Sequence, residues 1–450
     1  WSKNMPSAAE QLASSVNFGA IAKATELKQR ILFTLFALIV YRIGTYIPIP
    51  GINPGALDDI FSQNTGGILG MFDMFAGGAL SRMSIFALNI MPYISASIII
   101  QLLGSASKHI AQLKKDGDSG RQKIIQYTRY GTVFLAAVQA LGIATGLEGM
   151  TNSQGPAVDN PGLFFKISTI ITLTGATVFL MWLGEQITAR GIGNGISLII
   201  MAGIVAELPA ALISTLELGK TGALSGILIL FFLFLAALVI TFIVFMERAQ
   251  RRITIQYPKR QVGMKIMGGQ SSHLPLKINT AGVIPPIFAS SILLLPVTAL
   301  SINAGSGPNW LMDITSLLGR GQPLYMLLYV SAIVFFAFFY TSVVFNAQDT
   351  ADNLKNNGGF VPGIRPGEST ANYIDYVLTR LTVIGSAYLS AVCLLPELLI
   401  SQYSVPFYLG GTSLLIVVTV TMDTVAQVHS HLIAHQYEGL IKKAKLRGRF

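Results

Sequence analysis

Charge is scarce in this sequence. Only 12% of its 450 residues are Asp, Glu, Lys or Arg, whereas 52% are hydrophobic, and a soluble domain carries about 25% charged residues. Cysteine is scarcer still, because Cys393 is the single one, which excludes a disulfide framework and most cysteine-based metal sites. The shortage of charge runs along the whole chain, so the composition is typical of a membrane protein with several crossings.

Motifs for catalysis and nucleotide binding are also missing. The run LGKTG lacks the earlier glycine of a phosphate-binding loop, and GIGNG opens an apolar segment instead of following a strand. His429, His431 and His435 lie close together, but no cysteine or carboxylate set completes a zinc site around them. We therefore expect no enzymatic activity, no cofactor and no metal.

Long apolar runs are what the sequence has in abundance. A membrane-crossing helix needs about 20 mostly apolar residues. Ten segments meet this requirement: 31–47, 83–103, 130–147, 163–183, 192–214, 224–245, 278–300, 324–345, 381–400 and 409–428. Residues 1–30, which mix apolar and basic side chains, indicate an amphipathic helix at the membrane surface. The sequence predicts an all-α polytopic membrane protein.

Basic residues give these crossings a direction. All but five of the 31 Lys and Arg residues fall in connections that lie on one side of the predicted membrane; the exceptions are Arg42, Arg82, Lys166, Lys220 and Arg320. Because cytoplasmic loops are enriched in Lys and Arg, both termini are expected in the cytoplasm. An even number of crossings requires the same arrangement, so the net charge of +10 is first of all a signal of orientation.

Two cytoplasmic connections are longer than a turn requires. Residues 246–277 contain β-branched runs around a turn and predict a basic hairpin. Residues 346–380 place Arg365 between two Pro–Gly turns, on an expected exposed tip. These loops, with the basic tail 429–450, are either plain solvated loops or a docking surface for a large anionic partner.

The ten segments divide into two halves, 31–214 and 224–428, that repeat two patterns. The second and seventh segments share Pro-x-Ile-x-Ala-Ser, and the fifth and tenth share Gly-x-Ser-Leu-x-Ile. Five crossings per half would make the halves inverted repeats, which place a translocation path at their interface. Proline was expected to break the second and seventh helices, and a broken helix is tolerated in a membrane only beside protein or water.

The residues shared by these patterns are isoleucines. Ile94 matches Ile287, Ile200 matches Ile416, and Ile90 lies one turn before Ile94. If the four helices surround a path, these side chains form a hydrophobic waist that can gate by dewetting. The alternative is ordinary packing.

Polar residues within the crossings are few. Ser95, Gln139 and Asn279 either form one cluster that closes a seam between helices or make separate interhelical hydrogen bonds. Glu207 and Glu397 are expected near outer helix ends and Asp423 near an inner one, so the sequence offers no mid-membrane coupling charge. An ion-coupled secondary transporter of a small solute, which usually carries such a charge, is therefore the second hypothesis.

Seven stretches also carry a family resemblance. YIPIPGI, MFAGGALSRMSIFALNIMPYISASIIIQLL, GDSGRQKIIQYTRYGT, WLGEQITARGIGNGIS, HLPLKINTAGVIPPIFASS, TADNLKNNGGFVPGIRPGEST and PFYLGGTSLLIVVT closely resemble the bacterial SecY family. The resemblance runs from about Arg30 to the end of the chain. It implies ten transmembrane helices in two inverted halves around an hourglass pore, in the bacterial inner membrane. It also implies that unfolded or nascent polypeptides cross through this pore and that transmembrane segments leave it sideways into lipid.

The resemblance further implies roles for individual residues. Ile90, Ile94, Ile200, Ile287 and Ile416 match a pore ring, and residues 68–81 match a plug that includes Ile68, Met71, Phe72, Phe75, Gly77 and Gly78. Ser95, Gln139 and Asn279 match a lateral gate, and Lys259, Arg260 and Arg365 match docking surfaces for the ribosome or the SecA motor. Met264 and Lys265 depart from the family pattern, which weakens one docking contact. The implied partners are SecE, SecG, SecA, the ribosome, signal sequences, nascent chains and lipid.

Overall fold

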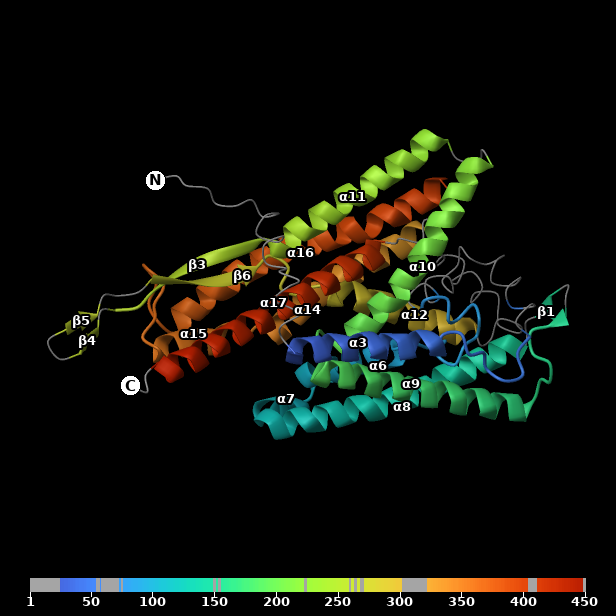
Figure 1. Cartoon of the computed structure of the whole chain (residues 1–450), viewed down its shortest axis with the longest axis horizontal. Helices are drawn as coiled ribbons and strands as arrows, with labels where there is room; N and C mark the ends of the chain where they lie inside the picture. The colour runs from blue at the N-terminus through green and yellow to red at the C-terminus, as the bar shows by residue number, and fades with distance from the viewer. Residues whose placement is uncertain are drawn as a thin grey trace.

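The computed structural model describes residues 25–53, 57, 73, 76–148, 151–152, 155–221, 225–258, 260–262, 265–267, 271–301, 322–403 and 411–447. Most of these residues are helical (Figure 1). The helices are α3 (Thr25–Gly44), α6 (Met91–Ala106), α7 (Lys108–Lys115), α8 (Gly117–Glu148), α9 (Leu163–Arg190), α10 (Gly195–Lys220), α11 (Gly226–Arg248), α12 (Ile284–Ser301), α14 (Pro323–Val344), α15 (Ala347–Asn356), α16 (Glu368–Tyr403) and α17 (Gly411–Arg447). The strands are β1 (Thr151–Asn152), β2 (Gly155–Pro156), β3 (Gln250–Gln256), β4 (Arg260–Val262), β5 (Lys265–Met267) and β6 (Ser271–Lys277).

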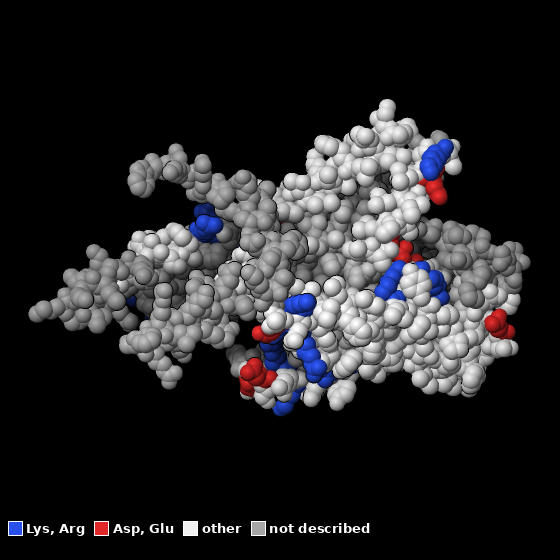
Figure 2. Space-filling view, viewed as in Figure 1, with Lys and Arg blue, Asp and Glu red and all other residues white. Residues whose placement is uncertain are grey.

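Each of the ten predicted crossings coincides with one helix. Within the described residues, seven helical stretches are long and apolar enough to span a membrane, and they contain α8, α9, α10, α11, α14, α16 and α17. The second and seventh crossings correspond to the shorter apolar helices α6 and α12, and the first corresponds to α3. Broad uncharged surface separates the groups of charged side chains on the face shown in Figure 2. The prediction of a polytopic helical membrane protein is confirmed.

The two shorter helices correct the expectation that proline breaks them. Residues 83–90 form turns, and α6 begins only at Met91, with Pro92 in its first turn. Pro285 and Pro286 likewise lie in the first turn of α12, which begins at Ile284. Proline is well tolerated there because the first backbone N–H groups of a helix have no intrahelical partner. These prolines therefore begin helices, and the helices themselves are not broken.

The two groups of five helices lie side by side in Figure 1. The helices α3, α6, α8, α9 and α10, coloured blue to green, pack against α11, α12, α14, α16 and α17, coloured yellow-green to red. Contacts of α6 and α8 with α12, and of α10 with α17, join the groups. One large apolar core contains buried side chains from both groups. The inverted relation between the two halves remains a prediction.

The predicted hairpin at 246–277 is confirmed. β3 and β6 pair antiparallel from Gln250–Lys277 to Gln256–Ser271. The hairpin is anchored by buried Ile253, which packs with Ile374 and Leu378 of α16. In Figure 1 the hairpin, α15 and the end of α17 lie at the same end of the molecule. We call this end the hairpin end.

Candidate functional site

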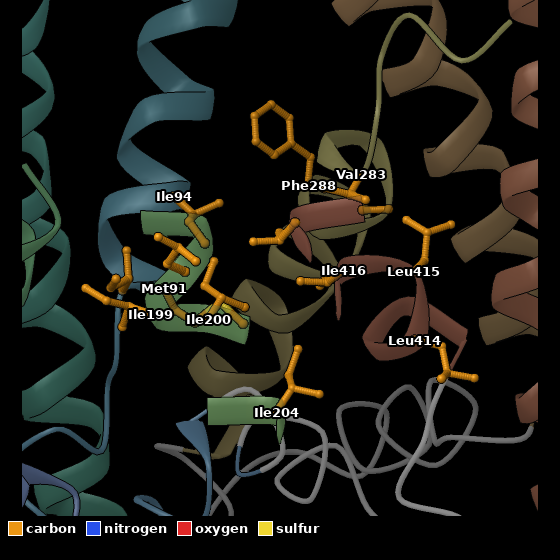
Figure 3. Close-up of a cluster of buried hydrophobic side chains, with 14 of the residues drawn as sticks. Met91, Ile94, Ile199, Ile200, Ile204, Val283, Phe288, Leu414, Leu415 and Ile416 are labelled. Atoms are coloured by element: carbon orange, nitrogen blue, oxygen red, sulfur yellow. The ribbon is translucent and has the colours of Figure 1, made fainter. Parts of the chain in front are cut away.

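Isoleucines from the two groups of helices meet in the middle of the molecule. Ile90, Ile94, Ile200 and Ile416 are each at most 6% exposed and belong to the central core, and Ile287 packs against it. In Figure 3, Ile94 and Ile200 extend from one side toward Ile416 on the other. The structure therefore brings together all five residues that the sequence predicted as a ring.

A small cavity of about 10 Å³ lies among these side chains. Its lining consists of Asn89, Ile90, Met91, Ile94, Ile200 and Ile287. A single water molecule needs about 10–15 Å³ of such space together with two to four polar partners. The cavity cannot hold a continuous file of water, so the isoleucine side chains are closely packed where the two groups of helices meet.

Glycines position two of the isoleucines. A Cβ atom on Gly195 would collide with the carbonyl oxygen of Gly184 in α9, and one on Gly411 would collide with the carbonyl oxygen of Val392 in α16. The first turns of α10 and α17 can therefore pack directly on neighbouring helix backbones only because these residues lack a side chain. Asn194 also caps α10, because its side chain accepts a hydrogen bond from the N–H of Ile196.

A tight turn positions Ile90. Asn89, the residue before it, has a φ of 48°, and its N–H donates to the carbonyl of Phe86 at 2.9 Å. Asparagine tolerates this left-handed conformation better than branched or bulky residues do. The turn lets the chain enter α6 with Ile90 facing the cavity.

On the side of the cluster away from the hairpin end lies the segment Ala76–Arg82. The backbone of Gly77 has a φ of +65°, and a Cβ atom there would lie 2.8 Å from the Cα of Gly203 in α10. Asp73 fixes the same segment, since its Oδ1 accepts from the N–H groups of Leu80 and Ser81 at 2.9 and 2.8 Å. Of the predicted plug residues, Gly77 and Gly78 are thus described, whereas Ile68, Met71, Phe72 and Phe75 lie outside the described residues.

The three predicted seam residues lie on or beside helices that pack together. Ser95 of α6 is 4% exposed, and the side-chain oxygen of Gln139 in α8 is buried without a hydrogen-bond partner among the described residues. Asn279, in the turn before α12, donates instead to Glu247 Oε1 at 2.6 Å and to the carbonyl of Gly282 at 3.1 Å. A weak hydrogen bond of 3.9 Å from the hydroxyl of Ser291 in α12 to the sulfur of Met91 joins α12 to α6.

A larger cavity of about 590 Å³ opens between the cluster and the hairpin end. Its polar lining includes Glu247, Lys277, Asn279, Asp423 and Gln427, and Lys277 is the last residue of β6. Glu247 was not predicted as a site residue, because in the sequence it stands at a helix end near several arginines. It is only 9% exposed, and its proximity to Asn279 becomes visible only in the fold.

Glu207 corrects another expectation. It lies about midway along α10, not near the outer end, because α10 continues to Lys220, beyond the predicted end at residue 214. Its carboxylate lies 3.8 Å from Arg82 Nη2. Glu207 is therefore paired with an arginine of the Ala76–Arg82 segment.

The predicted docking residues lie at the hairpin end. Arg365 is exposed between two turns that contain Gly363 and Gly367, both with positive φ, as the sequence predicted. Arg260 begins β4, and Lys259 lies outside the described residues. Paired backbone hydrogen bonds of 2.9 and 3.0 Å between Gln256 and Phe360 join the hairpin to the loop that carries Arg365. The two long connections, 246–277 and 346–380, are therefore joined to each other.

Metal-binding chemistry finds no support in the part of the chain that the structure describes. No group of three or more His, Cys, Asp or Glu side chains there could hold a metal ion. Cys393 is buried, and the weak bond that its sulfur accepts from Thr412 lies within the core between α16 and α17.

Comparison with known proteins gives consistent matches. A family model for SecY matches residues 84–425. The protein translocase subunit SecY of Escherichia coli strain K12 is 58% identical over 424 residues, which are 94% of this chain and 96% of that protein. A solved SecY structure whose title says that the plug domain stabilises the closed state and maintains a membrane seal has a TM-score of 0.60 at 19% identity, with 89% of this chain and 92% of that chain covered. Sec61 from a canine ribosome–channel complex has a TM-score of 0.57 at 17% identity, with the same coverage.

Proposed function

The chain belongs to the SecY family and is a protein-conducting channel subunit of a translocase, and on this premise we propose which of its residues form the path, the seals and the docking surface. The secondary-transporter hypothesis is set aside, because the relatives are translocase subunits and the structural neighbours are protein-conducting channels. The chain is not an enzyme.

The isoleucine cluster is the constriction through which an unfolded polypeptide passes. The observation that carries this proposal is the convergence of isoleucines from four helix starts in both halves: Ile90, Ile94, Ile200 and Ile287 line a cavity of about 10 Å³, and Ile416 belongs to the same buried core. Aliphatic side chains suit a substrate of varied sequence, because they adapt in shape and impose no specific hydrogen bonds. In the resting state they keep ions out by excluding water.

A photocrosslinking experiment tests this assignment. A photoreactive residue replaces Ile94 while a secretory precursor is stalled midway in inverted membrane vesicles, and we expect a crosslink to the mature part of the precursor. The same residue at Ile199 is the control, because Ile199 is fully buried on the same helix as Ile200 but does not line the cavity. Equal crosslinking at both positions, or at neither, contradicts the proposal.

Residues 68–81 form the plug on the outer side of the constriction. Support comes from the close packing of Gly77 against Gly203 of α10, three residues beyond Ile200 on the same helix. The SecY structure whose title describes a plug that seals the closed channel has the same fold. Ile68, Met71, Phe72 and Phe75 are assigned to the plug by their positions in the sequence.

The lateral gate lies between α6 and α8 on one side and α12 and α14 on the other. The support is that α12 contacts both α6 and α8 and that Ser95 is buried on α6. Ser95, Gln139 and Asn279 are the polar residues of this gate, and Asn279 anchors its mobile side to α11 through Glu247. Transmembrane segments and signal sequences leave through this seam into lipid.

Arg365, Lys259 and Arg260 form the docking surface for a ribosome or for the SecA motor. The two backbone hydrogen bonds between Gln256 of the hairpin and Phe360 of the Arg365 loop support a single surface, and ribosome-bound channels are among the structural neighbours. SecE and SecG are the proposed accessory subunits.

The chain is a multi-pass membrane protein, and we place it in the bacterial inner membrane with both termini in the cytoplasm. The basic loops at the hairpin end support this orientation. In this arrangement residues 31–214 and 224–428 form the two halves, with 1–30 and 429–450 as cytoplasmic segments.

A further inference from the structure

Two arginines converge on one backbone carbonyl at the outer side of the constriction. Arg42 of α3 donates from Nη1 to the carbonyl oxygen of Gly77 at 2.8 Å, and Arg82 donates from Nη2 to the same oxygen at 2.9 Å. Both guanidinium groups also lie over the ring of Tyr46, at 4.8 and 4.5 Å from its centre. A carbonyl that accepts two charged donors is held more firmly than one with a single neutral partner.

Two like charges so close together require compensation. The carboxylate of Glu207 on α10, which lies 3.8 Å from Arg82 Nη2, provides it. Arg82 Nε is buried and has no hydrogen-bond partner among the described residues, so the orientation of this guanidinium depends on the Gly77 carbonyl, the Tyr46 ring and Glu207. Glu207 also lies against Gly78, where an added Cβ atom would come within 2.6 Å of its Oε1.

A second contact links the same segment to the isoleucine cluster. The hydroxyl of Tyr41, which is fully buried, donates to the carbonyl of Ala76 at 3.4 Å and is hydrogen-bonded to the side chain of Asn89. Asn89 lines the cavity among the isoleucines. The Ala76–Gly78 segment is therefore tied to α3 by Tyr41 and Arg42, and to α10 through Arg82 and Glu207.

We propose that Arg82 and Glu207 form an electrostatic latch that holds the Ala76–Gly78 segment against α10 and so keeps the channel closed at rest. This inference rests on the plug assignment made above. Outward displacement of the segment must separate Arg82 from Glu207 of α10 and break the hydrogen bond from Arg42 of α3 to the Gly77 carbonyl. Glu207 is thus a positioning residue that acts through Arg82, and the strength of this ion pair sets how often the resting channel opens.

Single-channel recording of the full chain with its accessory subunits in planar bilayers tests the latch. Glu207→Gln is expected to raise the open fraction of the resting channel about fivefold, which corresponds to about 1 kcal/mol of lost ion-pair energy. Glu148→Gln is the matched control, because Glu148 forms a partly buried ion pair of 3.0 Å with Lys166 that touches no latch residue. It should leave the open fraction unchanged.

A double-mutant cycle separates the latch from a general structural effect. In an Arg82→Gln background, Glu207→Gln should add less than a twofold change, because its partner is already gone. Independent effects that multiply in the double variant would overturn the latch, as would an unchanged open fraction in Glu207→Gln alone. Open fractions are compared per assembled channel, so a loss of folded protein cannot imitate the result.

Gly77→Ala distinguishes failure of the latch from failure of the plug. Its methyl group forces the segment away from Gly203 whether or not the latch exists. If Gly77→Ala raises the open fraction and Glu207→Gln does not, the segment seals the channel without the latch. If neither does, the plug assignment itself is wrong.

Discussion

The tightest test of the constriction is to remove two of the side chains that line its cavity. Ile94 and Ile200 are 6% and 5% exposed, and both line the cavity of about 10 Å³. Replacing both by glycine removes eight carbon atoms, or roughly 200 Å³, which equals the share of about six or seven water molecules at about 30 Å³ each. A site that holds at most one water would become a hydrated opening.

We therefore expect the resting ion conductance of the Ile94→Gly/Ile200→Gly variant to rise at least about tenfold, since a hydrophobic gate depends on dewetting. The assay is ion conductance across planar bilayers that contain the purified channel complex. Packing is also lost, because a large-to-small substitution in a core costs about 2–5 kcal/mol and glycine within a helix about 1 kcal/mol more. The experiment therefore needs a control that loses a buried isoleucine without opening the cavity.

Ile199→Gly provides this control. Ile199 is the neighbour of Ile200 on α10, is fully buried, and does not line the cavity. It loses the same atoms from the same turn of helix. If the double variant conducts no more than Ile199→Gly per assembled channel, the isoleucines are packing residues and the constriction lies elsewhere.

Three further outcomes follow from the structure. Gly77→Ala should raise resting conductance, because a Cβ at a φ of +65° is strained and would lie 2.8 Å from Gly203 Cα; an unchanged conductance would mean that this contact does not seal the channel. Arg365→Glu should lower precursor translocation into vesicles about tenfold, equivalent to about 1.4 kcal/mol of docking, while the same charge reversal at exposed Lys355 should not; equal losses would indicate a net-charge effect. Asn279→Ala should lower the thermal unfolding midpoint of the complex, since a 9%-exposed carboxylate loses its 2.6 Å donor at a cost of about 1–3 kcal/mol; an unchanged midpoint would show that water replaces the amide.

The fold was predictable because its signals are long and redundant. Each crossing is a run of about twenty apolar residues, and the basic residues are concentrated in the connections on one side of the membrane. The hairpin at 250–277 and the exposed turn at Arg365 were also predictable, because alternating β-branched residues and Pro–Gly turns act locally. Such patterns need no knowledge of what lies opposite in space.

The pairing of polar residues was not predictable, because the partners are far apart in the sequence. Asn279 and Glu247 are 32 positions apart, and Arg82 and Glu207 are 125 positions apart, so nothing local marks them as partners. Glu207 was misplaced because the end of an apolar run does not mark the end of a helix: α10 continues through Leu216 and Glu217 to Lys220. The position of the helix end decides which side chains of α10 can contact the Ala76–Arg82 segment.

The helix boundaries change the interpretation of the repeated sequence patterns. The prolines begin helices and do not break them. Ile94 and Ile287 each lie three residues after the first residue of α6 and α12. Ile200 and Ile416 each lie five residues after the glycine that begins α10 and α17.

Proline and glycine therefore determine where the helices that carry the isoleucines begin. In α6 and α12, proline fixes the first turn, whose N–H groups need no intrahelical partner. In α10 and α17, glycine allows the first turn to lie directly on the backbone of a neighbouring helix. All four isoleucines then project from the first two turns of helices that start deep within the molecule. A constriction made of helix beginnings can widen when those helices separate as rigid bodies, without any helix unfolding, and this is what a channel for polypeptides of varied size requires.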